Sequence, residues 1–137
     1  MTFLGRMAVA VMMIVGVTGS SAIAESYSCV VQGKYTRGWI VPVYNISYTP
    51  GSKTIDVETF TESGERISRF KGQLVSNSSK RMVGRLLWKN APARPSGSVT
   101  VRYRARLDKG SMKFNVTASV GNHGQVETGR GTCKRRS

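Results

Sequence analysis

Apolar and polar residues alternate over two consecutive stretches in the second half of this chain, residues 99–107 and 112–120. A repeat of two places successive side chains on opposite faces of a β-strand. The turn-forming sequence Asp108-Lys109-Gly110-Ser111 lies between the two stretches, so they are predicted to form a β-hairpin. The apolar positions are Val99, Val101, Tyr103, Ala105 and Leu107 in the first stretch, and Met112, Phe114, Val116, Ala118 and Val120 in the second.

Six further stretches have strand-like composition, and Gly, Pro, Ser or Asn residues separate most of them. Short strands with turn signals about every 8–12 residues are typical of small antiparallel barrels and sandwiches. No segment has the i, i+3, i+4 periodicity of a helix. We therefore predict an all-β fold, an antiparallel up-and-down barrel of about eight strands, with a two-sheet β-sandwich as the alternative. The six stretches are residues 27–32, 39–48 (interrupted at Pro42), 54–61, 67–75, 81–89 and 125–133.

The two cysteines, Cys29 and Cys133, lie in the first and the last predicted strand. The chain has no C-x-x-C motif and one histidine, which favours a structural disulfide over a catalytic or metal-binding thiol. The disulfide would join the first strand to the last, as closure of a barrel requires. It would close a loop of about 104 residues, for which chain entropy predicts roughly 4–5 kcal/mol of stabilisation.

The first 24 residues have the three parts of a secretory signal peptide. Arg6 precedes the apolar stretch Met7 to Val17, and Ala22-Ile23-Ala24 fits the A-x-A cleavage pattern. The apolar stretch is shorter than the about 20 residues that span a bilayer. We expect residues 1–24 to be removed, and the protein to be exported to the periplasm or secreted.

Residues 25–137 are predicted to form one all-β domain with a short, flexible basic tail, Lys134-Arg135-Arg136. The chain contains 21 Lys and Arg residues against 7 Asp and Glu residues, a net charge of +14. Such an excess favours polyanions or an anionic membrane surface as partners. The alternative explanation is that the charge serves solubility only.

Three arginines, Arg102, Arg104 and Arg106, share one strand face at intervals of about 6.5–7 Å. Neighbouring strands of the predicted barrel add further basic residues to the same face, with Val83 and Leu87 among them. Guanidinium groups suit phosphate, sulfate and carboxylate because they form two parallel hydrogen bonds. The alternative is a solvated face without a ligand. The predicted anion-binding residues are Arg81, Arg85, Lys89, Arg102, Arg104, Arg106 and Lys113.

No catalytic, metal-binding or cofactor-binding residues are predicted, and the protein is interpreted as a non-enzymatic binding protein. His123 is the only histidine and lies in a turn-like sequence; Asp56 and Glu58 form an exposed acidic edge rather than a catalytic pair. The expected ligand is anionic envelope material: lipopolysaccharide, anionic lipid or acidic polysaccharide. Sequence-specific nucleic-acid binding is not expected, because Trp88 and Tyr103 lie on the face opposite the arginines.

Two alternative functions remain open at this level. One is a small-ligand carrier whose barrel interior is lined by Trp88, Tyr103 and Phe114. The other is a periplasmic inhibitor or interaction module that acts through loops such as the Ser63-Gly64 turn.

Three segments resemble small exported β-rich proteins of alphaproteobacteria. They are Tyr27-Ser28-Cys29, residues 101–108 (Val-Arg-Tyr-Arg-Ala-Arg-Leu-Asp) and Gly129-Arg130-Gly131-Thr132-Cys133. The resemblance implies an exported β-rich protein and brings no activity with it. Ser63-Gly64 also resembles the start of the inhibitory loop of membrane-bound lysozyme inhibitors, but the aromatic residue of that loop is missing and the positive charge would repel a basic lysozyme.

Overall fold

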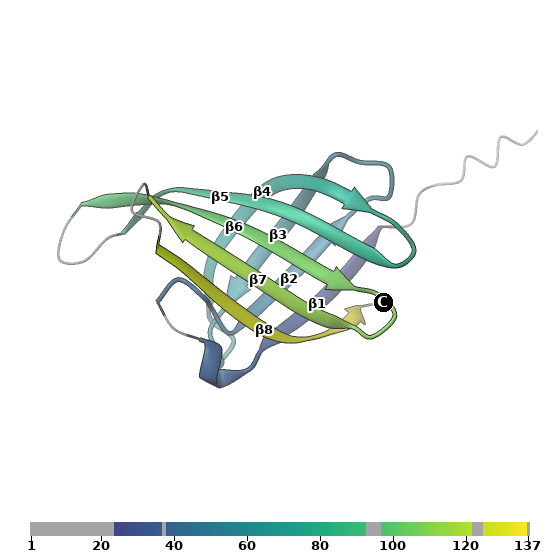
Figure 1. Cartoon of the computed structure of the whole chain (residues 1–137), viewed down its shortest axis with the longest axis horizontal. Helices are drawn as coiled ribbons and strands as arrows, with labels where there is room; N and C mark the ends of the chain where they lie inside the picture. Colours follow the sequence, from purple (N-terminus) through teal and green to yellow (C-terminus); the bar gives the residue numbers. More distant parts are fainter. Residues whose placement is uncertain (1–23, 37, 93–96, 122–124, 137) are drawn as a thin grey trace, which may run out of the picture.

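Eight antiparallel strands form a closed barrel, in which each strand pairs with its neighbours in sequence and β8 pairs with β1 (Figure 1). The structure is a computed structural model that describes residues 24–36, 38–92, 97–121 and 125–136. It confirms the predicted all-β barrel and excludes the sandwich. The strands are β1 (Glu25–Val31), β2 (Val43–Tyr48), β3 (Thr54–Phe60), β4 (Arg66–Asn77), β5 (Arg81–Pro92), β6 (Ser98–Asp108), β7 (Lys113–Val120) and β8 (Gln125–Arg136).

The alternation of the sequence becomes an inside and an outside surface of the barrel. In β6 the buried positions Val101, Tyr103, Ala105 and Leu107 alternate with exposed arginines. The inward side chains of the other strands complete one hydrophobic core, to which Phe114 belongs. Because one face of each strand is buried, the register is strongly specified and the outward residues are defined with it.

The seam between β1 and β8 closes the barrel. Cys29 lies opposite Cys133 in the register and forms the predicted disulfide, with 4.0 Å between the two Cα atoms. Close approach of the strands also needs Gly131, because a Cβ atom there would collide with the backbone of Val30. The Cys133 N–H donates to the carbonyl of Met112 at 2.8 Å, so the β6–β7 turn contacts the seam.

The predicted second strand begins four residues too early. Residues 39–42 form a loop, preceded by a short 3₁₀ helix, η1 (Gly33–Tyr35), and β2 starts at Val43. The Trp39 N–H donates to the Glu127 carboxylate at 2.7 Å, and Tyr103 Oη donates to the Trp39 carbonyl at 3.0 Å. Side chains from β6 and β8 thus satisfy backbone groups that a strand partner would otherwise satisfy.

Two further predictions were wrong at strand ends. Met112 lies in the β6–β7 turn with a φ of 57°, and β7 starts at Lys113. The C-terminal Lys134-Arg135-Arg136 is not a free tail, because it pairs with residues 26–28 of β1 and extends β8. Pairing with β1 satisfies backbone donors and acceptors that a flexible tail would leave to water.

Some predictions concern residues outside those described. The signal peptide lies there except for Ala24, and so does His123. Within the described ranges, no helix has the length and apolar character needed to cross a membrane.

Candidate anion-binding face

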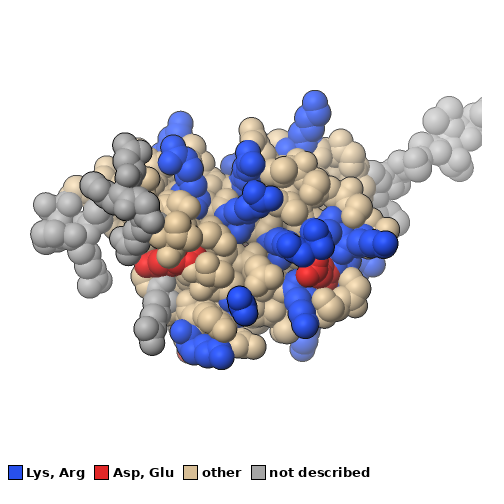
Figure 2. Space-filling model, in the orientation of Figure 1, with Lys and Arg blue, Asp and Glu red and all other residues tan. Residues whose placement is uncertain are grey.

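The outer surface of β5, β6 and β7 brings together most of the residues predicted to bind anions. The register places Arg85 directly opposite Arg104 and Leu87 opposite Arg102. All the arginines predicted for this face are exposed. Figure 2 shows Lys and Arg side chains spread over the face formed by β5 to β8, with acidic atoms confined to small areas.

Asp108 neutralises one end of this face. Its Oδ1 lies 3.1 Å from Nε of Arg81 and 3.6 Å from Nε of Arg106. Lys113 lies opposite Asp108 across the β6–β7 register. Exposed pairs of this kind contribute under about 1 kcal/mol each.

The centre of the face has no such compensation. Arg85, Arg102 and Arg104 form no ion pair with any acidic side chain in the described part of the chain. Like charges directly opposite each other on neighbouring strands destabilise a sheet. These three arginines, which we call the unpaired arginines, are therefore the residues most available to an external anion.

Lys89 lies apart from this centre. It is exposed beside the irregularity in β5 between Trp88 and Ala91, where it has no partner in the β5–β6 register. The adjacent Asn90 has a φ of 58°, which redirects the strand at this point. The regular β5–β6 register that holds Arg81 and Arg85 therefore does not extend to Lys89.

Only one of the two apolar residues expected on this face is accessible. Leu87 is 43% exposed, whereas Val83 is 6% exposed although it points outward. Val83 lies opposite Arg106 on one side and Ser76 on the other, outside the hydrophobic core. Leu87 is therefore the accessible one of the two, and Val126 of β8, 57% exposed, is a further apolar residue on the outer surface of β5–β8.

Sequence reasoning missed the contribution of β8. Arg130 lies opposite Asn115 of β7, which in turn lies opposite Arg106 of β6. The outward residues of β8 include Arg130 and Lys134, both exposed. The basic residues Arg130 and Lys134 are spaced for one strand face, but the inward positions 129 and 131 are glycines. Without apolar residues at those positions, the sequence does not show which side chains of this strand face outward.

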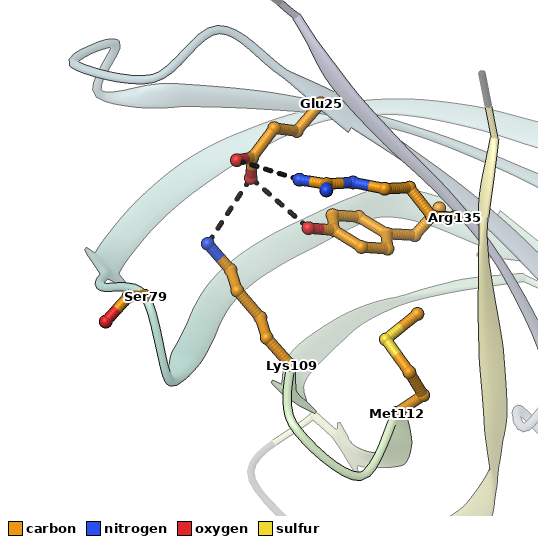
Figure 3. Close-up of a pocket in the computed structure, with 6 residues that line it drawn as sticks. Glu25, Ser79, Lys109, Met112 and Arg135 are labelled. Atoms are coloured by element: carbon orange, nitrogen blue, oxygen red, sulfur yellow. Dashed lines mark hydrogen bonds and ion pairs between the residues drawn. The ribbon is translucent and has the colours of Figure 1, made fainter.

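A second charged cluster closes one end of the barrel around Glu25 (Figure 3). Its carboxylate accepts hydrogen bonds from Tyr48 Oη at 2.5 Å and Lys109 Nζ at 3.3 Å, and from Arg135 at 3.3 Å. Partial burial alone would raise the pKa of Glu25, but the hydrogen bonds from Tyr48 and Lys109 and the Lys109 charge bring it below its ordinary value. The cluster lines a pocket of about 360 Å³.

The residues proposed for an interior carrier site are packing residues. Phe114 is 1% exposed and Tyr103 is 4% exposed, and the ring of Trp88 lies edge-on to Phe70 with centroids 5.5 Å apart. Burial raises the pKa of Tyr103 well above its ordinary value. Neither Trp88, Tyr103 nor Phe114 lines the pocket around Glu25.

The Ser63-Gly64 turn is exposed between β3 and β4. Gly64 has a φ of 92°, and its N–H donates to the Thr61 carbonyl at 3.1 Å. The turn therefore has the ordinary geometry of a tight connection that requires glycine.

Comparison with protein-family models, with curated proteins and with solved structures gives no match for this chain. The resemblance to exported alphaproteobacterial proteins stays a prediction.

Proposed function

We propose that this protein is a non-enzymatic binding protein that engages anionic envelope material through the outer face of β5–β8. The observation that supports this most strongly is the direct cross-strand pairing of Arg85 with Arg104, without an acidic partner for either within the described residues. An anion placed between two such guanidinium groups would form charge-assisted hydrogen bonds and remove their repulsion.

The ligand class follows from the chemistry of the face. Arginine binds phosphate, sulfate and carboxylate in a bidentate manner, and several arginines in a row suit a ligand with repeated negative charges. Lipopolysaccharide, an anionic lipid surface and an acidic polysaccharide all have this property. The Leu87 side chain, 43% exposed beside the arginines, adds a small apolar contact to the face.

We also propose that the protein is exported to the periplasm or secreted. The predicted signal peptide supports export, and so does the disulfide between Cys29 and Cys133. Disulfides form and persist in oxidising compartments and are rare in the cytosol.

The experiment is a binding panel with the disulfide-bonded protein. The panel holds lipopolysaccharide, vesicles containing phosphatidylglycerol, alginate and DNA, each at about 50 to 200 mM salt. We expect one member to bind near physiological salt. The triple variant Arg85→Gln, Arg102→Gln and Arg104→Gln should weaken that binding by at least about tenfold, which corresponds to 1.4 kcal/mol.

The matched control removes three positive charges elsewhere. Lys34, Lys53 and Arg66 are exposed and lie outside β5–β8. A control variant with all three changed to Gln has the same net charge as the first variant and should keep most of the affinity. Weak binding to every panel member that vanishes with salt and is equal in both variants would mean that net charge alone is responsible.

A further inference from the structure

A second pocket lies on the outer surface of β1–β3, away from the unpaired arginines. Its volume is about 280 Å³, close to the lower end of the about 300–1,000 Å³ found for ligand pockets. Short side chains, including Ser26 and Ser47, line it. Arg69 from β4 and Arg136 from β8 also line the pocket and supply long side chains.

The register gathers hydrogen-bond acceptors in this pocket. Asn45 of β2 lies opposite Glu58 of β3, and Ser47 lies opposite Asp56. Side chains directly opposite each other have Cβ atoms about 4.5–5.5 Å apart, so the two carboxylates and the carboxamide form one group. Asp56 is exposed and Glu58 is half-buried, which leaves both accessible from the pocket.

One of these acceptors has no partner within the protein. Asn45 Oδ1 is buried and makes no hydrogen bond, and it is the only such side-chain atom found among the described residues. Buried polar atoms in folded proteins are almost always hydrogen-bonded, so an exception calls for an explanation. Asn45 lines the pocket while this oxygen is shielded from it, so a ligand hydroxyl would supply the missing donor only after the carboxamide rotates toward the pocket.

The same pocket contains donors. Arg69 Nε lies 4.0 Å from Glu58 Oε1, and Arg136 lines the pocket next to Ser26, its register partner in β1. A bare cation in this pocket would face two guanidinium groups, and a simple anion would face two carboxylates. A ligand whose groups both donate and accept hydrogen bonds matches the mixture.

From this arrangement we infer that the pocket over β1–β3 is a binding site for a single neutral sugar ring. Each hydroxyl of a sugar donates one hydrogen bond and accepts others, so it can bridge a carboxylate and a guanidinium group. Phe60, which also lines the pocket, offers an aromatic surface for the apolar face of the ring. The site is independent of the basic face and would remain if that face bound nothing.

The test is an NMR titration of the disulfide-bonded protein with glucose, galactose, N-acetylglucosamine and mannose in separate experiments. We expect at least one sugar to produce saturable amide shifts that centre on Asn45, Asp56 and Glu58. The double variant Asp56→Asn and Glu58→Gln should weaken the binding by at least about tenfold, because hydrogen bonds to charged groups are the strong ones.

The control variant is Glu62→Gln with Glu65→Gln. It removes two negative charges from exposed residues of the β3–β4 connection, outside the pocket, and should bind the sugar as the unmodified protein does. The inference is overturned if no sugar gives saturable shifts, or if both double variants bind equally. It is also overturned if calcium chloride alone shifts the same amides while the sugars do not.

Discussion

The two sides of this barrel are built on the same alternation and differ sharply in what they present to solvent. β1, β2 and β3 contain no lysine or arginine, and their outward side chains are polar, acidic or apolar, the last including Val30 and Phe60. β5 to β8 present rows of arginine and lysine, and Asp108 is the acid that compensates part of them. Packing in the core constrains the inward-facing side chains of every strand. The outward-facing side chains can therefore differ between the two sides of the barrel without disturbing the fold.

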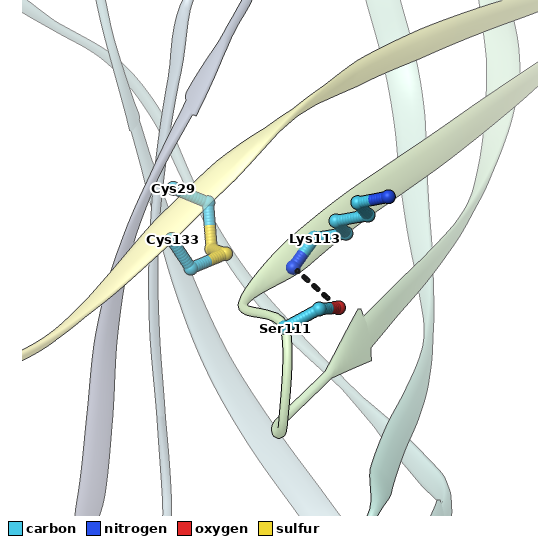
Figure 4. The surroundings of a disulfide bond; sticks show 4 residues. All are labelled: Cys29, Ser111, Lys113 and Cys133. Atoms are coloured by element: carbon cyan, nitrogen blue, oxygen red, sulfur yellow. Dashed lines mark hydrogen bonds between the residues drawn. A yellow bond between two sulfur atoms is a disulfide. The ribbon is translucent and has the colours of Figure 1, made fainter.

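The largest expected effect comes from the seam where the two sides meet. The Cys29–Cys133 disulfide joins β1, which contains no lysine or arginine, to basic β8 (Figure 4). Its removal by Cys29→Ala with Cys133→Ala should lower the free energy of unfolding by about 4–5 kcal/mol, because it closes a long loop. Urea unfolding of both proteins measures this. An effect under about 1 kcal/mol would mean that strand pairing alone holds the seam.

The next effect tests the packing of the same seam. A Cβ atom at Gly131 would collide with the Val30 backbone, so Gly131→Ala should destabilise the protein by about 1–3 kcal/mol. Gly110 in the β6–β7 turn has open space around its Cα, and Gly110→Ala is the control, expected within about 0.5 kcal/mol of the unmodified protein. Equal effects of the two changes in thermal unfolding would show that β1 and β8 can move apart freely.

A third prediction concerns the contact between the acid of β1 and cations of the other side. Glu25→Gln should cost about 1–3 kcal/mol at pH 7, since it removes charge-assisted hydrogen bonds from Lys109 and Arg135. Because the folded-state pKa of Glu25 is lowered, its stabilisation is present above the unfolded pKa near 4.5 and disappears as pH falls through the folded value.

The measurement is urea unfolding of both proteins from pH 7 down to acid. The difference in stability should shrink as pH falls below the ordinary range of a carboxyl group. Glu62→Gln, at an exposed position, is the control and should have little effect at any pH. A difference that stays constant with pH would place the cause in packing rather than in the charge of Glu25.

The hairpin of residues 99–120 shows how much of the fold the pattern predicted. A repeat of two specifies which side chains face outward, so the exposed arginines of β6 followed directly from the sequence. Strand ends were less predictable, because they depend on residues distant in sequence. The Glu127 carboxylate accepts a hydrogen bond from the loop at Trp39, and pairing with β1 extends β8 to the C-terminal residues.

The candidate sites divide in the same way. The arginines opposite each other on β5 and β6 could be predicted, because neighbouring strands of a meander lie side by side. Arg130 was not assigned to the face although residues 125–133 were predicted as a strand, since Gly129, inward against Ile40, leaves no apolar alternation to show which side chains face outward. The pocket around Asn45 depends on the sizes of side chains from several strands, so no local sequence pattern predicts it.

The smallest expected effect probes the basic side itself. If Arg85 and Arg104 repel each other across the register, Arg85→Gln should raise the free energy of unfolding by about 0.2–1 kcal/mol at low salt. The gain should fade at 1 M salt, where the screening length is only about 3 Å. Arg66→Gln, on an exposed residue of β4, serves as the control in parallel urea unfolding at both salt concentrations.

A loss of stability at both salt concentrations would contradict this account. It would mean that the aliphatic part of Arg85 stabilises the sheet by covering its outward neighbour Val83, which is 6% exposed. The arginine row would then be held in place by packing, and its charge would carry no stored repulsion for an anion to relieve. A gain confined to low salt would instead show that repulsion between arginines destabilises the β5–β8 side of the barrel. The opposite side has no such repulsion between basic residues, because β1–β3 contain no lysine or arginine.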